Sequence, residues 1–196
     1  YLSVSLSDIL YFMYTILMTK SLILAGGCFW CVEHDLRTAS GVISVTSGYS
    51  GGESTTPTYE DHRGHMEVVL VEYDDEKTSY KKLLQFFIDH IDPTDGGGQF
   101  GDRGDSYMSA IFVSNEDERS IASAVIQELN QSCIYDKPST VQILERKPFY
   151  QAEEYHQGYS EKNPLRYGLY RQGSGREAFV TNTCAVREEK KILWSD

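Results

Sequence analysis

The hydrophobic residues of this chain recur at two different spacings, which predict two kinds of secondary structure. Short apolar or β-branched runs between turn residues predict strands. Apolar residues three or four positions apart predict helices that bury one face. The predicted strands cover residues 21–25, 42–47, 65–73, 107–113 and 140–145, and the predicted helices cover residues 28–39, 80–91 and 116–131.

The order of these elements predicts an α+β fold. Two βαβ-like units with short connections favour a two-layer sandwich of the split-βαβ, ferredoxin-like type. Asn115 is a candidate N-cap for the third helix, and residues 48–52 are predicted to be a glycine-rich loop. No repeat or linker divides the core, so we expect residues 18–196 to form one domain. The region after Tyr150 is polar and turn-rich, and we expect it to wrap the core as a long C-terminal segment.

The first 17 residues form an apolar stretch in which Asp8 is the only charge. The stretch lacks the basic start and small-residue cleavage site that are typical of a signal peptide. Its serines and Asp8 also weaken the case for a membrane-spanning helix. We expect residues 1–17 to be an extension outside the folded domain, and a membrane anchor is the less favoured alternative.

Composition and charge narrow the classes of partner. The chain has 196 residues, 40% of them hydrophobic, and a net charge of -11, so it is long enough to bury one core. An acidic surface disfavours nucleic acid and anionic membranes as partners, because both require clustered Lys and Arg. Four cysteines in a chain of this length are too few for a secreted disulfide scaffold. We therefore expect redox-active or free thiols in a reducing compartment, by default the cytoplasm, and a monomer.

Cys28 stands where a predicted strand ends, Gly26 and Gly27 turn the chain, and a helix begins. Free N–H groups and the dipole at a helix N-terminus stabilise a thiolate, which is the reactive form of cysteine. We therefore expect a lowered pKa at Cys28. Phe29 and Trp30 follow and provide an apolar wall for a methyl-bearing substrate. The alternative is that Cys28 is an ordinary buried cysteine among core aromatic residues. It does not explain why the glycine turn, the helix start and the two aromatic residues coincide.

Several motifs in the same order resemble those of the A-type methionine sulfoxide reductases. The resemblance extends from about Leu22 to about Glu177, nearly the whole chain. The matching segments are Gly27-Cys28-Phe29-Trp30, Gly48-Tyr49-Ser50-Gly51-Gly52, Pro57-Thr58-Tyr59-Glu60, Gly64-His65-Met66-Glu67-Val68-Val69, Asp92-Pro93-Thr94 followed by Gln99 to Tyr107, and Tyr155-His156-Gln157.

The resemblance implies a chemistry for several polar residues. Cys28 is the expected nucleophile on the sulfur of methionine sulfoxide, free or in proteins, with preference for the S epimer. Glu67 shares a strand face with valines, and an apolar setting raises the pKa of a carboxyl so that it acts as a general acid. By resemblance, Tyr49, Tyr107 and Asp102 surround the sulfoxide oxygen. No bound cofactor or metal is expected. Without the resemblance, each of these residues has an ordinary structural explanation, and His65 and His156 are expected to order loops.

The sequence does not decide which cysteine resolves the oxidised form of Cys28. Attack by Cys28 leaves a sulfenic acid, which condenses with a second thiol to a disulfide that thioredoxin or dithiothreitol can reduce. Cys31 has the C-x-x-C spacing, whose Cα separation a disulfide accepts. Cys184 lies in a polar C-terminal tail. Many family members carry a cysteine where this chain has Ser174, and Cys133 is taken as a bystander. Direct reduction of the sulfenic acid is the third possibility.

Three other functions compete with this interpretation. A general dithiol oxidoreductase fits the C-x-x-C spacing but not Glu67 and its tyrosines. A zinc module with Cys28, Cys31 and His34 lacks the two spaced ligand pairs of a structural site. A non-catalytic ferredoxin-like binding domain is compatible with the fold alone.

Overall fold

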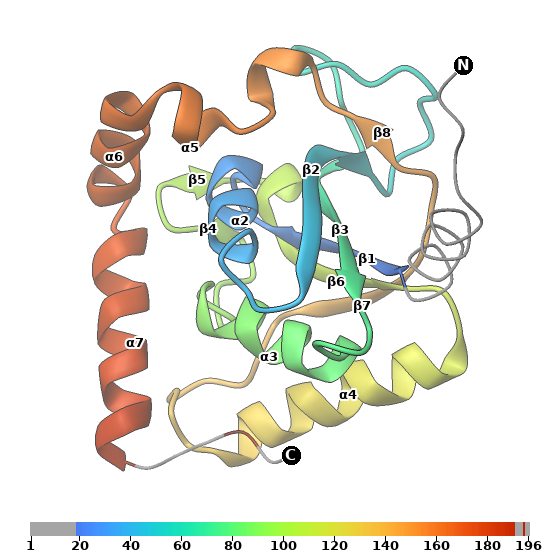
Figure 1. Ribbon diagram of the computed structural model, residues 1–196. Helices are drawn as coiled ribbons and strands as arrows, with labels where there is room; N and C mark the ends of the chain where they lie inside the picture. The colour runs from blue at the N-terminus through green and yellow to red at the C-terminus, as the bar shows by residue number, and fades with distance from the viewer. Residues whose placement is uncertain (1–18, 191–193, 195–196) are drawn as a thin grey trace, which may run out of the picture.

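The computed structural model describes residues 19–190 and residue 194 (Figure 1). The strands are β1 (Thr19–Gly26), β2 (Val42–Ser50), β3 (Met66–Asp74), β4 (Gly98–Gln99), β5 (Asp102–Arg103), β6 (Ser109–Val113), β7 (Gln142–Glu145) and β8 (Tyr150–Gln151). The helices are α2 (Phe29–Leu36), α3 (Tyr80–Asp89), α4 (Glu116–Gln131), α5 (Tyr159–Lys162), α6 (Pro164–Gly173) and α7 (Arg176–Lys190). Short 3-10 helices cover Asp105–Tyr107 and Glu154–His156.

Six strands form one mixed sheet in the order β7-β6-β1-β3-β2-β8. All neighbours are antiparallel except β6 and β7, which are parallel. The parallel pair follows from its connection, because α4 crosses between the two strands and returns the chain in the same direction. Strands β4 and β5 form a separate small hairpin. The predicted α+β class is therefore confirmed.

The two faces of the sheet bury different sets of side chains. On one face, Leu22, Leu24, Val69 and Val71 pack with residues of α2, α3 and α4 into the main core. On the other face, Ile23, Ala25, Val68, Ala110 and Phe112 form a smaller cluster. Because alternate residues of a strand point to opposite faces, the continuous apolar run of β1 serves both clusters.

The ends of the elements agree with local sequence signals in some places and not in others. The side chain of Asn115 accepts a hydrogen bond from the amide of Glu118 at 2.9 Å, so the predicted N-cap is confirmed. The predicted loop at residues 48–52 is wrong at its start, because β2 continues to Ser50. Gly48 and Tyr49 pair there with β8, and a Cβ on Gly48 would lie 2.4 Å from the carbonyl oxygen of Tyr150.

The segment after Tyr150 is helical from Tyr159 onward, so the prediction of a turn-rich segment is wrong for that part. Helices α5, α6 and α7 run along one side of the domain, with α6 and α7 at the left of Figure 1. Pro164 begins α6, where a proline is tolerated because the first amides of a helix have no partner inside it. Tyr167 and Arg171, one turn apart, are the buried residues of α6. A polar segment thus folds as helix because a few widely spaced side chains reach the core.

The predictions for residues 1–17 lie outside the described residues. Within residues 19–190, no helix combines the length and the apolar character that crossing a membrane requires.

Candidate active site

Cys28 lies in the sharp turn between β1 and α2. Gly27 adopts a φ of +79°, and a Cβ at that position would lie 2.5 Å from the Cβ of Gln99 and 3.0 Å from a guanidinium nitrogen of Arg176. Only glycine fits such a turn without strain. Cys28 is the N-cap of α2, and its side chain is 6% exposed. The glycine turn predicted from the sequence is therefore present, and it places the Cys28 thiol in a buried position.

A small cavity of about 70 Å³ lies in front of this thiol. Six of the seven residues expected at the catalytic and substrate-binding site line it, and Tyr49 does not. Two further tyrosines, which the sequence analysis did not select, take part. The lining residues are Cys28, Phe29, Trp30, Tyr59, Glu67, Asp102, Tyr107 and Tyr170.

Glu67 is buried on β3 and faces the start of α2. Its Oε2 atom accepts a hydrogen bond from the amide of Phe29 at 3.0 Å. Burial raises the pKa of Glu67 to about 8; the amide of Phe29 opposes this shift, and the charge of Asp102 adds to it. At neutral pH the carboxyl therefore holds a proton, as a general acid must.

The expected low pKa of Cys28 is contradicted. Burial raises the pKa of this thiol well above its ordinary value, and the neighbouring Cys31 thiol and the charge of Glu67 raise it further. The amide of Phe29, at the start of the helix, donates to Glu67 rather than to the sulfur. Desolvation and a nearby carboxyl thus outweigh the helix dipole, which acts only over the first turn.

Three tyrosines supply hydroxyls at the cavity. Burial is the largest cause that raises the pKa of Tyr59, Tyr107 and Tyr170, so all three remain hydroxyl donors at neutral pH. The hydroxyl of Tyr170, on α6, hydrogen-bonds the carboxyl of Asp102. The C-terminal segment therefore closes one wall of the cavity.

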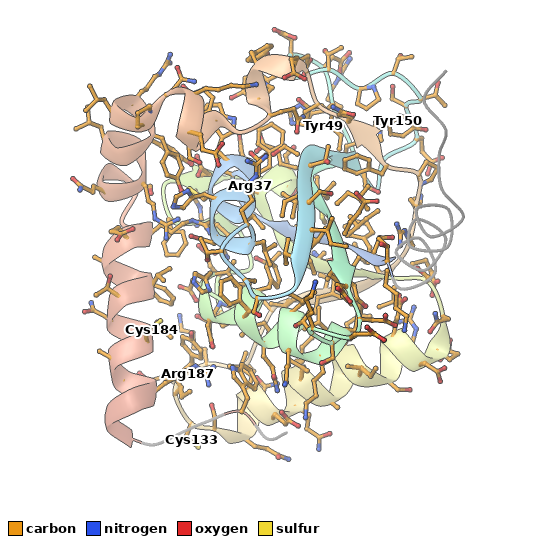
Figure 2. The ribbon with its side chains drawn as sticks, viewed as in Figure 1. Arg37, Tyr49, Cys133, Tyr150, Cys184 and Arg187 are labelled. Atoms are coloured by element: carbon orange, nitrogen blue, oxygen red, sulfur yellow. The ribbon has the colours of Figure 1, made fainter. Side chains whose placement is uncertain are left out.

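Tyr49 lies on β2 near β8, as Figure 2 shows, and does not line the cavity. Its hydroxyl donates to Glu153 Oε2 at 3.1 Å, and its ring centre lies 5.8 Å from that of Phe29. Glu153 also accepts the amide of Tyr59 at 2.9 Å. Tyr59 belongs to the Pro57-Thr58-Tyr59-Glu60 motif, whose tyrosine had no predicted role.

A layer of aromatic rings holds Trp30 in place. Trp30 Nε1 donates to His156 Nδ1 at 3.0 Å, and the ring of Trp30 stacks on Tyr159 with a centroid distance of 3.7 Å. Burial lowers the pKa of His156, which favours the neutral ring that can accept this bond. The apolar wall expected from Phe29 and Trp30 is therefore rigid on the Trp30 side.

Cys31 lies on the side of α2 that faces α5 and α6, where it packs with Tyr159 and Tyr167 and is 0% exposed. Its thiol is hydrogen-bonded to that of Cys28, and this bond is the largest cause that lowers the pKa of Cys31 to about 7. Both cysteines are free thiols.

Cys184 lies on α7 rather than in an irregular tail, as Figure 2 shows. It is exposed, as is Cys133 beyond α4. Helix α7 starts beside the site at Arg176, and eight residues of helix place Cys184 about 12 Å further along the axis. The polar C-terminal segment that carries Cys184 is therefore helical, and this helix leads away from the site.

His34, the third ligand of the rival zinc module, has its Nδ1 atom 3.1 Å from the hydroxyl of Ser160. Among residues 19–190 and 194, no three His, Cys, Asp or Glu side chains gather closely enough to hold a metal ion.

The chemistry of the cavity follows from these contacts. The thiol can attack an atom held at the centre of the cavity. A carboxyl can deliver a proton to an oxygen on that atom, and the hydroxyl groups can stabilise the charge that develops on the oxygen. A second thiol touches the first and can take up the oxidised product as a disulfide. The site thus belongs to the class of thiol-dependent reductases.

Comparison with known proteins specifies the family. The profile described as "Peptide methionine sulfoxide reductase" matches residues 20–188. The peptide methionine sulfoxide reductase MsrA of Bacillus pumilus is 47% identical over 160 residues, which are 80% of this chain and 90% of that protein. The chain therefore belongs to the peptide methionine sulfoxide reductase family, and its activity is that of a peptide-methionine (S)-S-oxide reductase.

Solved structures share the fold. Methionine sulfoxide reductase A of Corynebacterium diphtheriae superposes with a TM-score of 0.66 at 29% identity, covering 76% of each chain. Mxr1 from Saccharomyces cerevisiae in complex with Trx2 superposes with a TM-score of 0.53 at 23% identity, covering 73% of this chain and 86% of that one. The mixed sheet with C-terminal helices is thus an arrangement of this family.

Proposed function

We propose that Cys28 performs the reduction by direct attack of its Sγ on the sulfoxide sulfur, with Glu67 as the general acid. The observation that carries this assignment is the placement of Glu67. Its buried carboxyl, with a pKa of about 8, lines the same small cavity as the Cys28 thiol. A protonated acid is needed there because the sulfoxide oxygen leaves poorly as an anion.

The first step balances without any outside group. The electron pair of the Cys28 sulfur forms a bond to the sulfoxide sulfur, and the protonated oxygen leaves as water when the S–O bond breaks. That water then attacks the Cys28 sulfur and loses a proton, while the new S–S bond breaks with its electron pair on methionine. A thiol and a sulfoxide thus become a sulfenic acid and methionine. Glu67 and the ionising thiol give one proton each to the oxygen, and Glu67 regains the proton that the attacking water loses, so the carboxyl is unchanged at the end of the step.

The remaining cavity residues bind and orient the substrate. Phe29 and Trp30 form the apolar wall for the methyl group and the methionine stem. Tyr107 and Tyr59 donate hydrogen bonds to the oxygen as it gains charge. Asp102 orients the hydroxyl of Tyr170 through their hydrogen bond. Tyr49, which donates to Glu153, acts on the site only through the wall behind Phe29.

Cys31 is the resolving thiol in this proposal. It touches Cys28 in the reduced protein, whereas Cys184 lies on a helix that leads away from the site. A disulfide between Cys28 and Cys31 has the C-x-x-C form that thioredoxin-like proteins reduce by thiol–disulfide exchange. A Trx2 complex of a protein with this fold supports a thioredoxin-type reductant, and dithiothreitol serves in the assay.

Three finer assignments complete the proposal. The run β1-α2-β2-β3-α3-β6 has the spatial strand order β6-β1-β3-β2, which supports a split-βαβ core extended by β7 and β8. Four free thiols support a reducing compartment such as the cytoplasm. A single chain carries every residue of the proposed site, as a monomer requires.

The test is an assay of both epimers of a blocked methionine sulfoxide, first with dithiothreitol and then with thioredoxin and its reductase. Wild type is compared with Cys28→Ser, Cys31→Ser and Cys184→Ser. We expect reduction of the S epimer alone and no activity in Cys28→Ser. Cys31→Ser should complete one round and then stop with thioredoxin, while Cys184→Ser should turn over as wild type does.

Three other outcomes of this assay would change the proposed roles of the cysteines. An active Cys28→Ser variant would remove the nucleophile from the proposal. Reduction of neither epimer by wild type, together with reduction of a disulfide substrate, would point to the plain dithiol oxidoreductase that the C-x-x-C spacing permits. Loss of thioredoxin-supported turnover in Cys184→Ser would transfer the resolving role to that thiol.

A further inference from the structure

Arg176 is a buried cation for which the mechanism above has no use. Its side chain is 2% exposed. Nη2 donates to the carbonyl of Gly26 at 2.6 Å, and Nη1 donates to the carbonyl of His90 at 3.0 Å. The guanidinium also lies 4.8 Å from the ring centre of Phe100. Its partners are thus two neutral carbonyls and a ring.

The absence of a carboxylate sets Arg176 apart from two comparable arginines. Arg171 on α6 pairs with Asp35 at 2.8 Å and Glu177 at 2.5 Å. Arg187 on α7 pairs with Asp89 at 2.6 Å. Across residues 19–190 and 194, no acidic side chain forms an ion pair with Arg176. A buried charge without a counter-charge is costly, so proteins retain one mainly where it acts on another group.

The position of Arg176 points to the cysteine pair as that group. Its Nη2 atom lies against the Gly26–Gly27 turn that precedes Cys28, where a Cβ on Gly27 would meet it at 3.0 Å. It also lines a narrow internal gap together with Val32 and Asp35, which follow Cys31 on α2. The guanidinium therefore lies beside the first turns of α2, on the inner side of the thiols.

The sequence around Arg176 differs from that of many family members at a position near the site. Residues 173–176 read Gly-Ser-Gly-Arg, with Ser174 where many family members carry a cysteine. The C-terminal segment of this chain thus brings a cation to the site and no thiol at that place. An arginine at this place can act on the thiols through its charge.

We propose that Arg176 is a positioning residue that holds Cys31 as a thiolate, ready to attack the sulfenic acid of Cys28. The inference rests on the proposed role of Cys31 as the resolving thiol. The Cys31 sulfur forms a bond to the Cys28 sulfur, and the bond from Cys28 to oxygen breaks. The oxygen leaves as water after it accepts a proton from the Glu67 carboxyl. A thiolate, a sulfenic acid and one proton thus become a disulfide and water.

The charges that face Cys31 agree with this role. The hydrogen bond from Cys28 is the largest cause that lowers the pKa of Cys31 to about 7; Arg176 and then Arg171 lower it further, and burial and Asp35 act in the opposite direction. Arg171 is largely neutralised by its two acidic partners, which leaves Arg176 as the uncompensated cation. The titratable and charged groups around Cys31 are Cys28 and Asp35 on α2, Glu67 on β3, Tyr159 on α5, Tyr167, Tyr170 and Arg171 on α6, and Arg176 on α7.

The experiment separates the two chemical steps in a single turnover. Reduced full-length protein is mixed with one equivalent of methionine sulfoxide and no reductant, and quenched samples are assayed for methionine and for remaining thiols from pH 5.5 to 9. In Arg176→Met we expect the ratio of disulfide formation to methionine release at pH 7 to fall about fivefold for the first unit by which the pKa of Cys31 rises above about 7, and about tenfold for each further unit. The pH midpoint of disulfide formation should rise accordingly, and Arg176→Lys should restore most of it.

Arg187→Met is the matched control. Arg187 is a buried arginine on the same helix, but it is ion-paired with Asp89, and eleven residues of helix place it about 16 Å beyond Arg176. Its loss should lower the thermal stability and leave the pH midpoint of disulfide formation in place. An equal shift in Arg187→Met and Arg176→Met would reduce Arg176 to a structural role and overturn the inference.

A second measurement needs no charge-removing variant and covers the case in which Arg176→Met fails to fold. The thiolate absorbance of wild type minus that of Cys31→Ser, followed against pH, reports the titration of Cys31. A midpoint near 7 supports the inference, and a midpoint at or above the ordinary value for cysteine overturns it. If Cys31→Ser forms its first-turnover disulfide as wild type does, the proposed resolving thiol itself is wrong. If that disulfide is lost but Arg176→Met keeps the wild-type midpoint, only the inference about Arg176 fails.

Discussion

Helix α2 presents two cysteines, three residues apart, to two different environments. Cys28 faces a cavity that holds the buried carboxyl of Glu67 and several tyrosine hydroxyls. Cys31 faces the C-terminal helices, which supply the guanidinium groups of Arg171 and Arg176. The pKa of Cys28 is raised by burial, whereas the pKa of Cys31 is lowered, first by the bond from Cys28 and then by the arginines.

This difference separates the two halves of the reaction. The first step needs an acid beside the sulfoxide oxygen, and the same burial that keeps Glu67 protonated also keeps Cys28 protonated in the free protein. The second step needs a thiolate, which a cationic setting favours. In the proposed mechanism, one short helix thus serves both steps because different parts of the chain pack against its two sides.

The largest effect is expected on the cavity side. Glu67→Gln should slow methionine release in the first turnover by about 10²–10⁴, the range for loss of a general acid. The wild-type rate should decline as pH rises through about 8, because the carboxyl carries its proton only below its pKa. Rapid-quench assays across this pH range check both points. A Glu67→Gln variant that keeps the wild-type rate and the same decline would remove Glu67 from the acid role.

The Asp35→Asn variant tests the environment of Cys31, which contains Arg171 and Arg176. Asp35 and Arg171 form a buried ion pair, so we expect a loss of about 3 kcal/mol in the free energy of unfolding, measured with denaturant. Because the charge of Asp35 raises the pKa of Cys31, its removal should also extend the Cys31 thiolate to lower pH. Asp61→Asn, which breaks an exposed pair with Arg63, should leave the stability unchanged. A Cys31 pKa that rises in Asp35→Asn would contradict the electrostatic picture.

The hydroxyl groups of the cavity should give the next largest effect. Tyr107→Phe and Tyr59→Phe each remove a hydroxyl donor from the cavity and keep the aromatic ring, and we expect each to slow methionine release about a hundredfold. Single-turnover rates with saturating sulfoxide measure this directly. Wild-type rates in both variants would show that the oxygen is stabilised by Glu67 alone.

The smallest effect is expected at Tyr49. Its hydroxyl donates to Glu153 outside the cavity, so Tyr49→Phe should lower the stability by about 1 kcal/mol and change the rate far less than Tyr107→Phe does. Thermal unfolding and the same single-turnover assay make the comparison. A rate loss as large as that of Tyr107→Phe would return Tyr49 to the role that family resemblance first gave it.

Local pattern and motif order predicted the elements that build the cavity floor. The strand before Cys28, the helix after it and the strand that carries Glu67 are found close to their expected positions. Each depends on neighbours in the sequence, since glycine turns, apolar spacing and caps act over a few residues. Motif order also predicted six of the residues that line the cavity and the family to which the chain belongs.

The tertiary structure alone decided which side of α2 each thiol faces and what charge surrounds it. The sequence predicted a low pKa at Cys28 from the helix start, but packing buries that thiol beside Glu67 and reverses the direction. Tyr170, Arg171 and Arg176 reach the cysteines from segments about 140 residues away, and no local spacing records such contacts. Burial and charge at a site depend on everything packed around it, which is why the place of Cys28 in the cavity was predictable from the sequence and its electrostatic partners were not.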